Sequence, residues 1–96
     1  MHTASPVLVE NVKDENDLIK PSVFGVRNVI QACQTHKVKR LVLLSSVRAV
    51  GYPRPGEEPT NNCYSEKNLS DVKYDKSTAY TKSKVFAEKL AWEMLN

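Results

Sequence analysis

A tyrosine and a lysine four residues apart, Tyr80 and Lys84 in the stretch YTKSK, are the residues best suited to chemistry. On a helix, residues i and i+4 lie on the same face, one turn apart. A lysine ammonium in that position stabilises a tyrosine phenolate, so the phenol can give a proton to a carbonyl oxygen or take one from an alcohol. The spacing also arises by chance in a lysine-rich helix, so the pair alone is weak support.

Two serines, Ser45 and Ser46, directly follow the apolar run Leu41 to Leu44. In open α/β sheets, ligands bind beyond the carboxyl ends of the strands. A serine hydroxyl at such an end can bond a substrate oxygen and share its developing charge. The alternative is a serine that only begins a loop. A long loop and the start of a helix lie between Ser46 and Tyr80. This is enough chain to bring Tyr80 back to the end of the strand that Ser46 follows.

The elements that must position these side chains are predicted from apolar spacing and from proline and glycine. Residues 1–5 are expected to end a buried strand, since a proline follows, and residues 16–36 have helical spacing. Residues 40–46, RLVLLSS, form a continuous apolar run typical of a strand buried on both faces. A long loop to about residue 76 and a closing helix follow. The order strand, helix, strand, long loop, helix predicts an α/β layer fold.

Both predicted helices have an apolar stripe and a starting signal. The stripes are Val26, Val29, Ile30 and Cys33 in the first helix, and Phe86, Leu90 and Met94 in the second. Asp14 or Asn16 can cap the first helix, and Ser77 or Thr78 the second. Pro21 predicts a kink or a late start in the first helix.

Composition narrows the function classes. With 96 residues, 41% of them hydrophobic and 26% charged, the chain is at most one small domain. The net charge of +3 is scattered, which favours a solvated surface over a nucleic-acid site. There is no apolar run of membrane-spanning length, no secretion signal at the start, and no metal-ligand spacing around Cys33 and Cys63. We therefore expect a cytoplasmic chain without a nucleic-acid, membrane or metal partner.

Four stretches, in this order and spacing, resemble the central portion of extended short-chain dehydrogenases/reductases, within the NAD-dependent epimerase/dehydratase superfamily. They are HTASPV, ENDLIKPSVFGVRNVIQAC, VKRLVLLSSVRAV and YTKSKVFAEKLAWE. The resemblance is to the dihydroflavonol reductase and cinnamoyl-CoA reductase branch and covers nearly the whole chain, most weakly in the proline-rich loop. HTASP and AEKLAWE are the branch-specific pieces, whereas YxxxK and the serine pair belong to the superfamily at large.

The resemblance implies a Rossmann fold and a nicotinamide cofactor, NADP with NAD possible. Tyr80 matches the catalytic acid/base of the family, and Lys84 matches the lysine that holds the nicotinamide ribose and stabilises the phenolate. Ser46 matches the serine that orients the substrate carbonyl. The cofactor-binding residues implied in this way are Thr3, Ala4, Ser5, Ser45, Tyr80 and Lys84. The long loop with Tyr64 and Leu69 would border the substrate.

The chain departs from the family pattern in two places. Ser22 and Val26 stand where relatives often have asparagine and threonine near the cofactor. No glycine-rich turn precedes HTASP, since the only glycines are Gly25, Gly51 and Gly56, so the loop that binds the pyrophosphate is missing. Residues 1–96 are thus expected to be the central part of a NAD(P)-binding Rossmann domain, without its N-terminal Gly-rich unit and C-terminal substrate region.

The expected function is reduction of a ketone or aldehyde to an alcohol by hydride transfer, with Tyr80 as the proton donor. A sugar-nucleotide epimerase or a hydroxysteroid dehydrogenase of the same superfamily remains an alternative, because both use the same pair of residues. A non-catalytic chain that acts through a partner is a further alternative. The two long helices are a candidate homodimer surface. The sequence does not determine the substrate or the choice between NAD and NADP.

Overall fold

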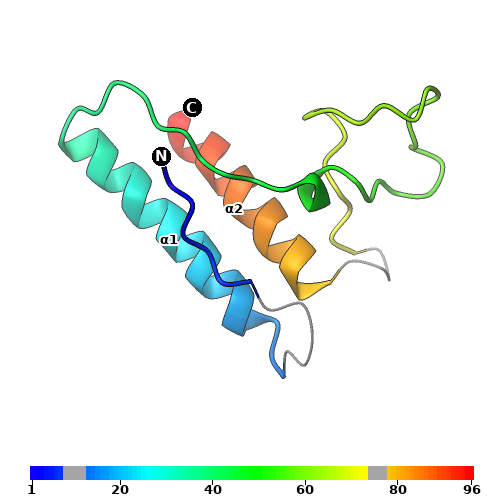
Figure 1. The fold of residues 1–96 in the computed structure, drawn as a ribbon, viewed down its shortest axis with the longest axis horizontal. Coiled ribbons are helices and arrows are strands. Elements are labelled where there is room, and N and C mark those ends of the chain that lie inside the picture. The colour runs from blue at the N-terminus through cyan, green and yellow to red at the C-terminus, as the bar shows by residue number, and fades with distance from the viewer. Residues whose placement is uncertain (8–12, 74–77) are drawn as a thin grey trace.

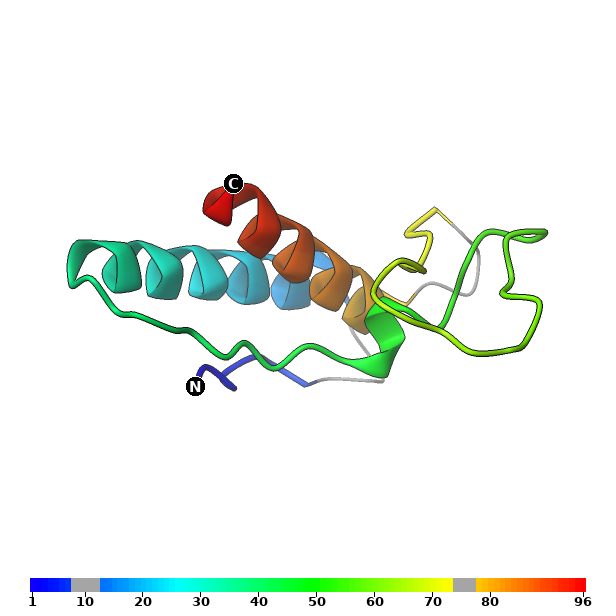
Figure 2. The ribbon, with the colours of Figure 1, turned by 90° about the horizontal axis from the view of Figure 1, so that it is seen from above.

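The computed structural model of the chain describes residues 1–7, 13–73 and 78–96. Its helical elements are α1 (Asn16–Thr35), the short 3-10 helix η1 (Val47–Ala49) and α2 (Ala79–Leu95). The two long helices pack against each other, and η1 packs against α2. The N-terminal segment and the segment after α1 run extended along one side of the helix pair (Figures 1 and 2). The described part of the chain therefore has a helical layer and a thin extended layer.

The first predicted helix is confirmed as α1. The backbone N–H of Asn16 donates to an Asp14 side-chain oxygen at 3.0 Å in the turn before the helix. The N-cap residue is Glu15 and makes no side-chain capping bond, so the prediction that Asp14 or Asn16 caps the helix is wrong. The helix begins at Asn16 and continues through Pro21, so the predicted late start is wrong. Tertiary packing explains this continuity, because Leu18, Val26 and Ile30 of α1 are buried on both sides of the proline.

The second predicted helix is confirmed as α2, and Thr78 is its cap. The Thr78 side-chain oxygen accepts a hydrogen bond from the backbone N–H of Thr81 at 3.2 Å. The predicted apolar stripe is only half-buried. The buried side chains of α2 are instead mostly small or polar: Thr81, Ser83, Lys84, Val85, Ala87 and Ala91. Neither this helix nor any other in the described residues is long and apolar enough to cross a membrane.

The two predicted strands are present only as extended segments joined at one parallel bridge, between His2 and Leu43. The His2 backbone N–H donates to Val42 O at 2.8 Å, and the Leu44 N–H donates to His2 O at 3.0 Å. No strand is formed within the described residues, so the predicted strand order is not confirmed. A parallel ladder is stable when further strands flank it, and the described residues provide only these two segments.

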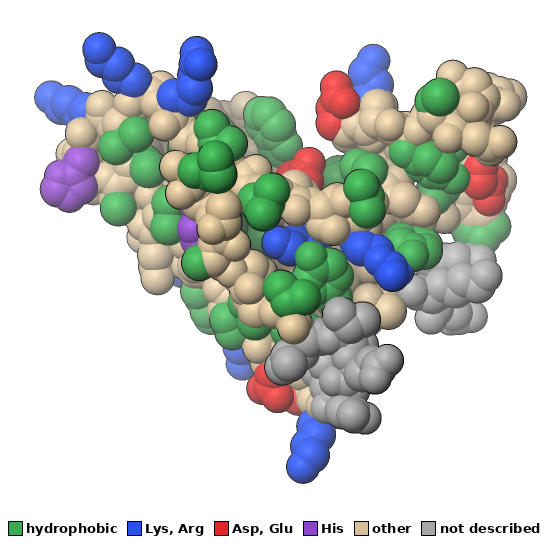
Figure 3. Space-filling model, in the orientation of Figure 1, with side chains coloured by type: hydrophobic (Ala, Val, Ile, Leu, Met, Phe, Trp, Pro, Cys, Tyr) green, Lys and Arg blue, Asp and Glu red, His purple; other side chains and the backbone are tan. Residues whose placement is uncertain are grey.

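The prediction that RLVLLSS is buried on both faces is wrong for the described residues. Leu41 and Leu43 pack against the hydrophobic core that α1 and α2 share, whose buried members are Val26, Ile30, Ala87 and Ala91. Val42 and Leu44 point the other way, as alternation along an extended chain requires, and they are 52% and 57% exposed. Hydrophobic side chains accordingly appear across the face on which the extended segments lie (Figure 3).

The long loop after Ser46 is closed at its base by Ser70, which is 3% exposed. The Ser70 hydroxyl donates to Arg48 O at 2.7 Å and accepts from the Tyr52 N–H at 3.1 Å. Outside this base, Arg54 and Asp71 form a salt bridge at 3.0 Å. A hydrogen bond from the Lys73 backbone N–H, followed by the bond from Arg54, holds the pKa of Asp71 below its usual value. The base of this loop is thus fixed beside the start of α2.

Candidate functional site

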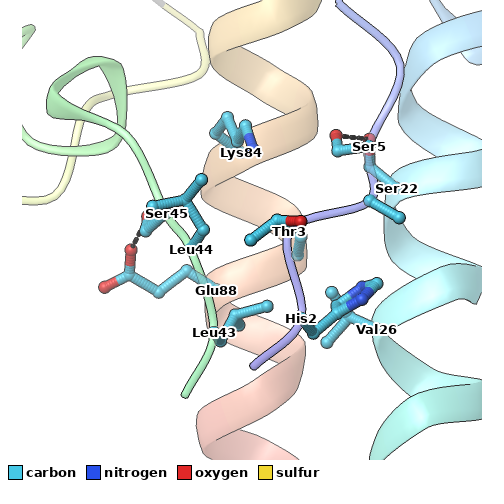
Figure 4. Close-up of a pocket in the computed structure, with 12 residues that line it drawn as sticks. His2, Thr3, Ser5, Ser22, Val26, Leu43, Leu44, Ser45, Lys84 and Glu88 are labelled. Carbon is cyan, nitrogen blue, oxygen red and sulfur yellow. Dashed lines mark hydrogen bonds between the residues drawn. The ribbon is translucent and has the colours of Figure 1, made fainter.

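A small cavity lies where α1, α2 and the two extended segments meet (Figure 4). Its volume is about 20 Å³, which is the space of about one water molecule. The cavity brings together five of the predicted site residues: Thr3, Ala4, Ser5, Ser45 and Lys84. Its size suits a hydroxyl-sized part of a ligand. Ser46 and Tyr80, the other predicted site residues, do not line it.

Lys84 is the most unusual side chain of this cavity. It is only 7% exposed, and within residues 1–7, 13–73 and 78–96 it forms no salt bridge and no hydrogen bond. Figure 4 shows it on α2, with Ser45 on one side and Thr3 and Ser5 on the other. A buried ammonium without a partner is costly. Its place in a cavity that serine and threonine side chains help to line is therefore a feature that core packing alone does not explain.

Tyr80 lies in the first turn of α2, half-buried and one turn before Lys84. The Lys84 Nζ is 5.8 Å from the centre of the Tyr80 ring, within the range of a cation–π contact. The predicted pairing of an ammonium and a phenol on one helix face is therefore present.

Ser45 and Ser46 have opposite hydrogen-bonding roles. The Ser45 hydroxyl donates to a Glu88 carboxylate oxygen at 2.5 Å. The Ser46 side-chain oxygen instead accepts from the Arg48 backbone N–H at 3.2 Å, as the cap of η1. A hydroxyl has one proton and two lone pairs. Among the described residues the Ser46 proton has no acceptor and is available for a ligand oxygen, whereas the proton of Ser45 is already used.

The N-terminal segment is fixed to α1 by a pair of serines. Ser5 Oγ and Ser22 Oγ are 3.0 Å apart and hydrogen-bonded, and Ser22 is buried. Thr3 and Ala4 are exposed beside the cavity. Ser22, one of the residues that departs from the family pattern, therefore forms a hydrogen bond within the chain.

Sequence reasoning missed Glu88, which bonds Ser45 and lines the cavity. The signal was present, because Glu88 follows Lys84 by four residues, as Lys84 follows Tyr80. The three side chains therefore project from one side of α2. A search for pairs of residues overlooks such a third member.

Comparisons with known proteins identify the family of this chain. The model of the 3-beta hydroxysteroid dehydrogenase/isomerase family matches residues 1–94. The chain belongs to this family. Its members have a Rossmann-type α/β fold, which agrees with the predicted fold class at that level. The predicted relationship to the epimerase/dehydratase superfamily is confirmed.

Curated members of related families are similar over nearly the whole chain. An anthocyanidin reductase of Vitis vinifera is 41% identical over 96% of the chain, and a dihydroflavonol 4-reductase of Gerbera hybrida is 39% identical over 96%. A protein of Candida albicans assigned as an NADPH-dependent methylglyoxal reductase is 34% identical over 99%. The chain spans only 28%, 26% and 30% of these proteins, respectively. No solved structure matches the chain significantly. The predicted likeness to the dihydroflavonol reductase branch is thus confirmed.

Proposed function

We propose that this chain carries the proton-transfer part of an oxidoreductase site that reduces a ketone or aldehyde to an alcohol with a nicotinamide cofactor. The proposal assigns Tyr80, Lys84 and Ser46 to the reaction. It also assigns Thr3, Ala4, Ser5 and Ser45 to the side of the cofactor. The names of the similar proteins support it, because the three compared above are all reductases.

The observation that supports it best is the buried, unpartnered Lys84 ammonium. A structural lysine would reach solvent with its charged end or pair with a carboxylate. Lys84 is buried and pairs with no carboxylate within the described residues. It faces a cavity with the space for a hydroxyl group, lined by serine and threonine side chains as well as apolar ones. The ribose hydroxyl oxygens of a nicotinamide nucleotide would accept hydrogen bonds from this ammonium and offset its burial.

The residues present fit only the nicotinamide end of such a cofactor. Lys84, Thr3 and Ser5 would hold the ribose, while the 96 residues contain no glycine-rich turn for the pyrophosphate. A reduced nicotinamide bound here supplies a hydride to the substrate carbonyl carbon. NADP is the proposed form, with NAD possible, because one of the three similar proteins is described as NADPH-dependent.

The chain's own residues manage the proton and the developing charge. Ser46 directs its free hydroxyl proton to the substrate carbonyl oxygen and stabilises the negative charge that grows there. Tyr80 gives its phenolic proton to that oxygen, which completes the alcohol. The Lys84 ammonium stabilises the phenolate left on Tyr80 until a proton from solvent replaces the one transferred.

The same side chains serve epimerases and hydroxysteroid dehydrogenases of this superfamily, so those activities are the second candidate. The similarity to anthocyanidin and dihydroflavonol reductases favours a carbonyl reductase. A non-catalytic chain acting through a partner remains the rival of a different class, and it predicts no use for an unpaired buried lysine.

The test uses dihydronicotinamide riboside, which contains the nicotinamide and its ribose but needs no pyrophosphate site. In an NMR titration of the 96-residue chain, we expect saturable shifts at Lys84 with a Kd of about 1 mM, a typical affinity for a small fragment. Lys84→Met should abolish them, and Lys89→Met, which changes an exposed lysine of the same helix, should not. Shifts that do not saturate, or that persist in Lys84→Met, would contradict the proposal.

A further inference from the structure

The contact between Ser45 and Glu88 limits what the cavity can bind at Ser45. An ionised carboxylate can only accept hydrogen bonds, so the proton in the 2.5 Å contact is the one that Ser45 donates. Both residues line the cavity with Lys84. With its proton directed at Glu88, Ser45 presents only lone pairs to anything that enters.

We propose that Glu88 is a positioning residue that fixes Ser45 as a hydrogen-bond acceptor, so that the cavity at Ser45 takes a hydrogen-bond-donating group. The inference rests on the proposed function, and within it the donor is the amide N–H of the nicotinamide. Glu88 itself contacts Ser45 and acts through it.

The neighbouring serine shows why this fixed direction matters. Ser46 accepts from the Arg48 N–H and keeps its proton for a ligand oxygen. Two adjacent hydroxyls without such partners could each rotate and serve either role. Glu88 accepts the proton of Ser45, and the oxygen of Ser46 accepts the Arg48 N–H as the cap of η1. Each hydroxyl is thereby held in one role, and the two roles are opposite. Ser45 therefore selects a donor, and Ser46 selects an acceptor such as a carbonyl oxygen.

Charged side chains of both signs line the cavity with Ser45. Lys84, one turn before Glu88 on α2, is the basic group that shares the cavity, and His2 lines it from the N-terminal segment. The Ser45 hydroxyl thus lies between a carboxylate that accepts its proton and an ammonium that can bond other oxygens. A ligand with both donor and acceptor atoms, such as a nicotinamide riboside, matches this order of groups.

The test compares two reduced ribosides by NMR titration of the 96-residue chain. One carries the amide of nicotinamide, and the other carries a 3-acetyl group, which has no N–H to donate. We expect the original chain to bind the amide about tenfold more tightly, which is the effect of one hydrogen bond at a half-buried site. In Glu88→Met and Glu88→Ala, which have no acceptor at this position, the preference should fall to about twofold or less, because the Ser45 proton is no longer directed away from the ligand.

Two controls separate positioning from general damage. Glu93→Gln changes an exposed glutamate of the same helix and should keep the full preference. Ser45→Ala should remove the preference, and Glu88→Met added to it should change nothing further, since Glu88 acts through Ser45. Melting temperatures of all variants identify those that lose the fold. Glu88→Met keeps the length of the side chain but removes the acceptor, so it is the variant that keeps the test decisive.

The outcomes distinguish this inference from the proposed function. Binding of both ribosides with equal affinity by the original chain would overturn the acceptor role of Ser45 and leave the cofactor site standing. A preference that persists in a folded Glu88→Met would overturn the role of Glu88. If neither riboside binds the original chain, the proposed cofactor site and, with it, this inference are overturned.

Discussion

Replacing Lys84 by methionine should make the protein more stable and less able to bind. Methionine keeps a long, flexible, apolar side chain in the space of the lysine stem, and it removes the ammonium. Lys84 is 7% exposed and has no polar partner within the described residues. Its charge therefore opposes folding, and a ligand in the cavity would offset that cost.

The size of the gain follows from two opposing effects. Removal of a buried charge relieves a desolvation penalty of several kcal/mol. The contact between Lys84 Nζ and the Tyr80 ring, at 5.8 Å, is lost, and such contacts are worth about 0.5–2 kcal/mol. The net effect should be a gain of about 1–3 kcal/mol. For a domain of this size, that raises the melting temperature by roughly 5 to 20 °C.

Thermal denaturation of both proteins, followed by circular dichroism, measures this effect. Lys89→Met is the matched control, because Lys89 is exposed on the same helix, and its change should stay within about 0.5 kcal/mol. The binding titration with dihydronicotinamide riboside is run on the same samples. A Lys84→Met protein that melts well below the original would refute the reasoning, because the ammonium would then be stabilising the fold through contacts within the chain.

Three further predictions concern the loop and the core. Ser70→Ala should destabilise the chain by about 1–3 kcal/mol in thermal denaturation, because two partly buried backbone groups lose their partner, whereas Ser65→Ala in the exposed loop should have little effect. The pKa of Asp71 is lowered in the folded chain, so the stability it provides should be complete above about pH 4 and be lost at lower pH. Denaturation curves of Asp71→Asn should lack this acid-dependent part, and an unchanged acid dependence would argue against the bonds from the Lys73 N–H and from Arg54. Ile30→Ala should cost about 2–5 kcal/mol in denaturant unfolding, since Ile30 is 1% exposed in the shared core.

The helices could be predicted closely because their signals are local. The apolar spacing of residues 16–36 and the threonine before Ala79 identify both long helices almost to the residue. The grouping of Lys84 with Ser45 and the N-terminal residues was also predictable, through the resemblance to a family. Each of these inferences needs only a short stretch of sequence or a known pattern.

The strands and the role of Glu88 were harder to predict because they depend on residues distant in the sequence. Whether RLVLLSS forms a strand is decided by what lies beside it, and one bridge to His2 is the pairing found in the described residues. The bond from Ser45 to Glu88 joins residues 43 positions apart. The spacing of Glu88 after Lys84 places it on the same side of α2, but this spacing alone does not show that its carboxylate meets a serine.

The buried face of α2 is where the general rules of packing are broken, and that is why it indicates function. An ordinary helix would bury Phe86 and Leu90 and expose its lysine and serines. α2 buries Thr81, Ser83 and Lys84 while Trp92 is exposed. Such a conflict between local pattern and structure lowers stability and persists where a site requires it. If the polar face were only a packing accident, apolar replacements along it would stabilise the chain without any loss of binding; the expected loss of riboside binding in Lys84→Met is the result that separates a site from an accident.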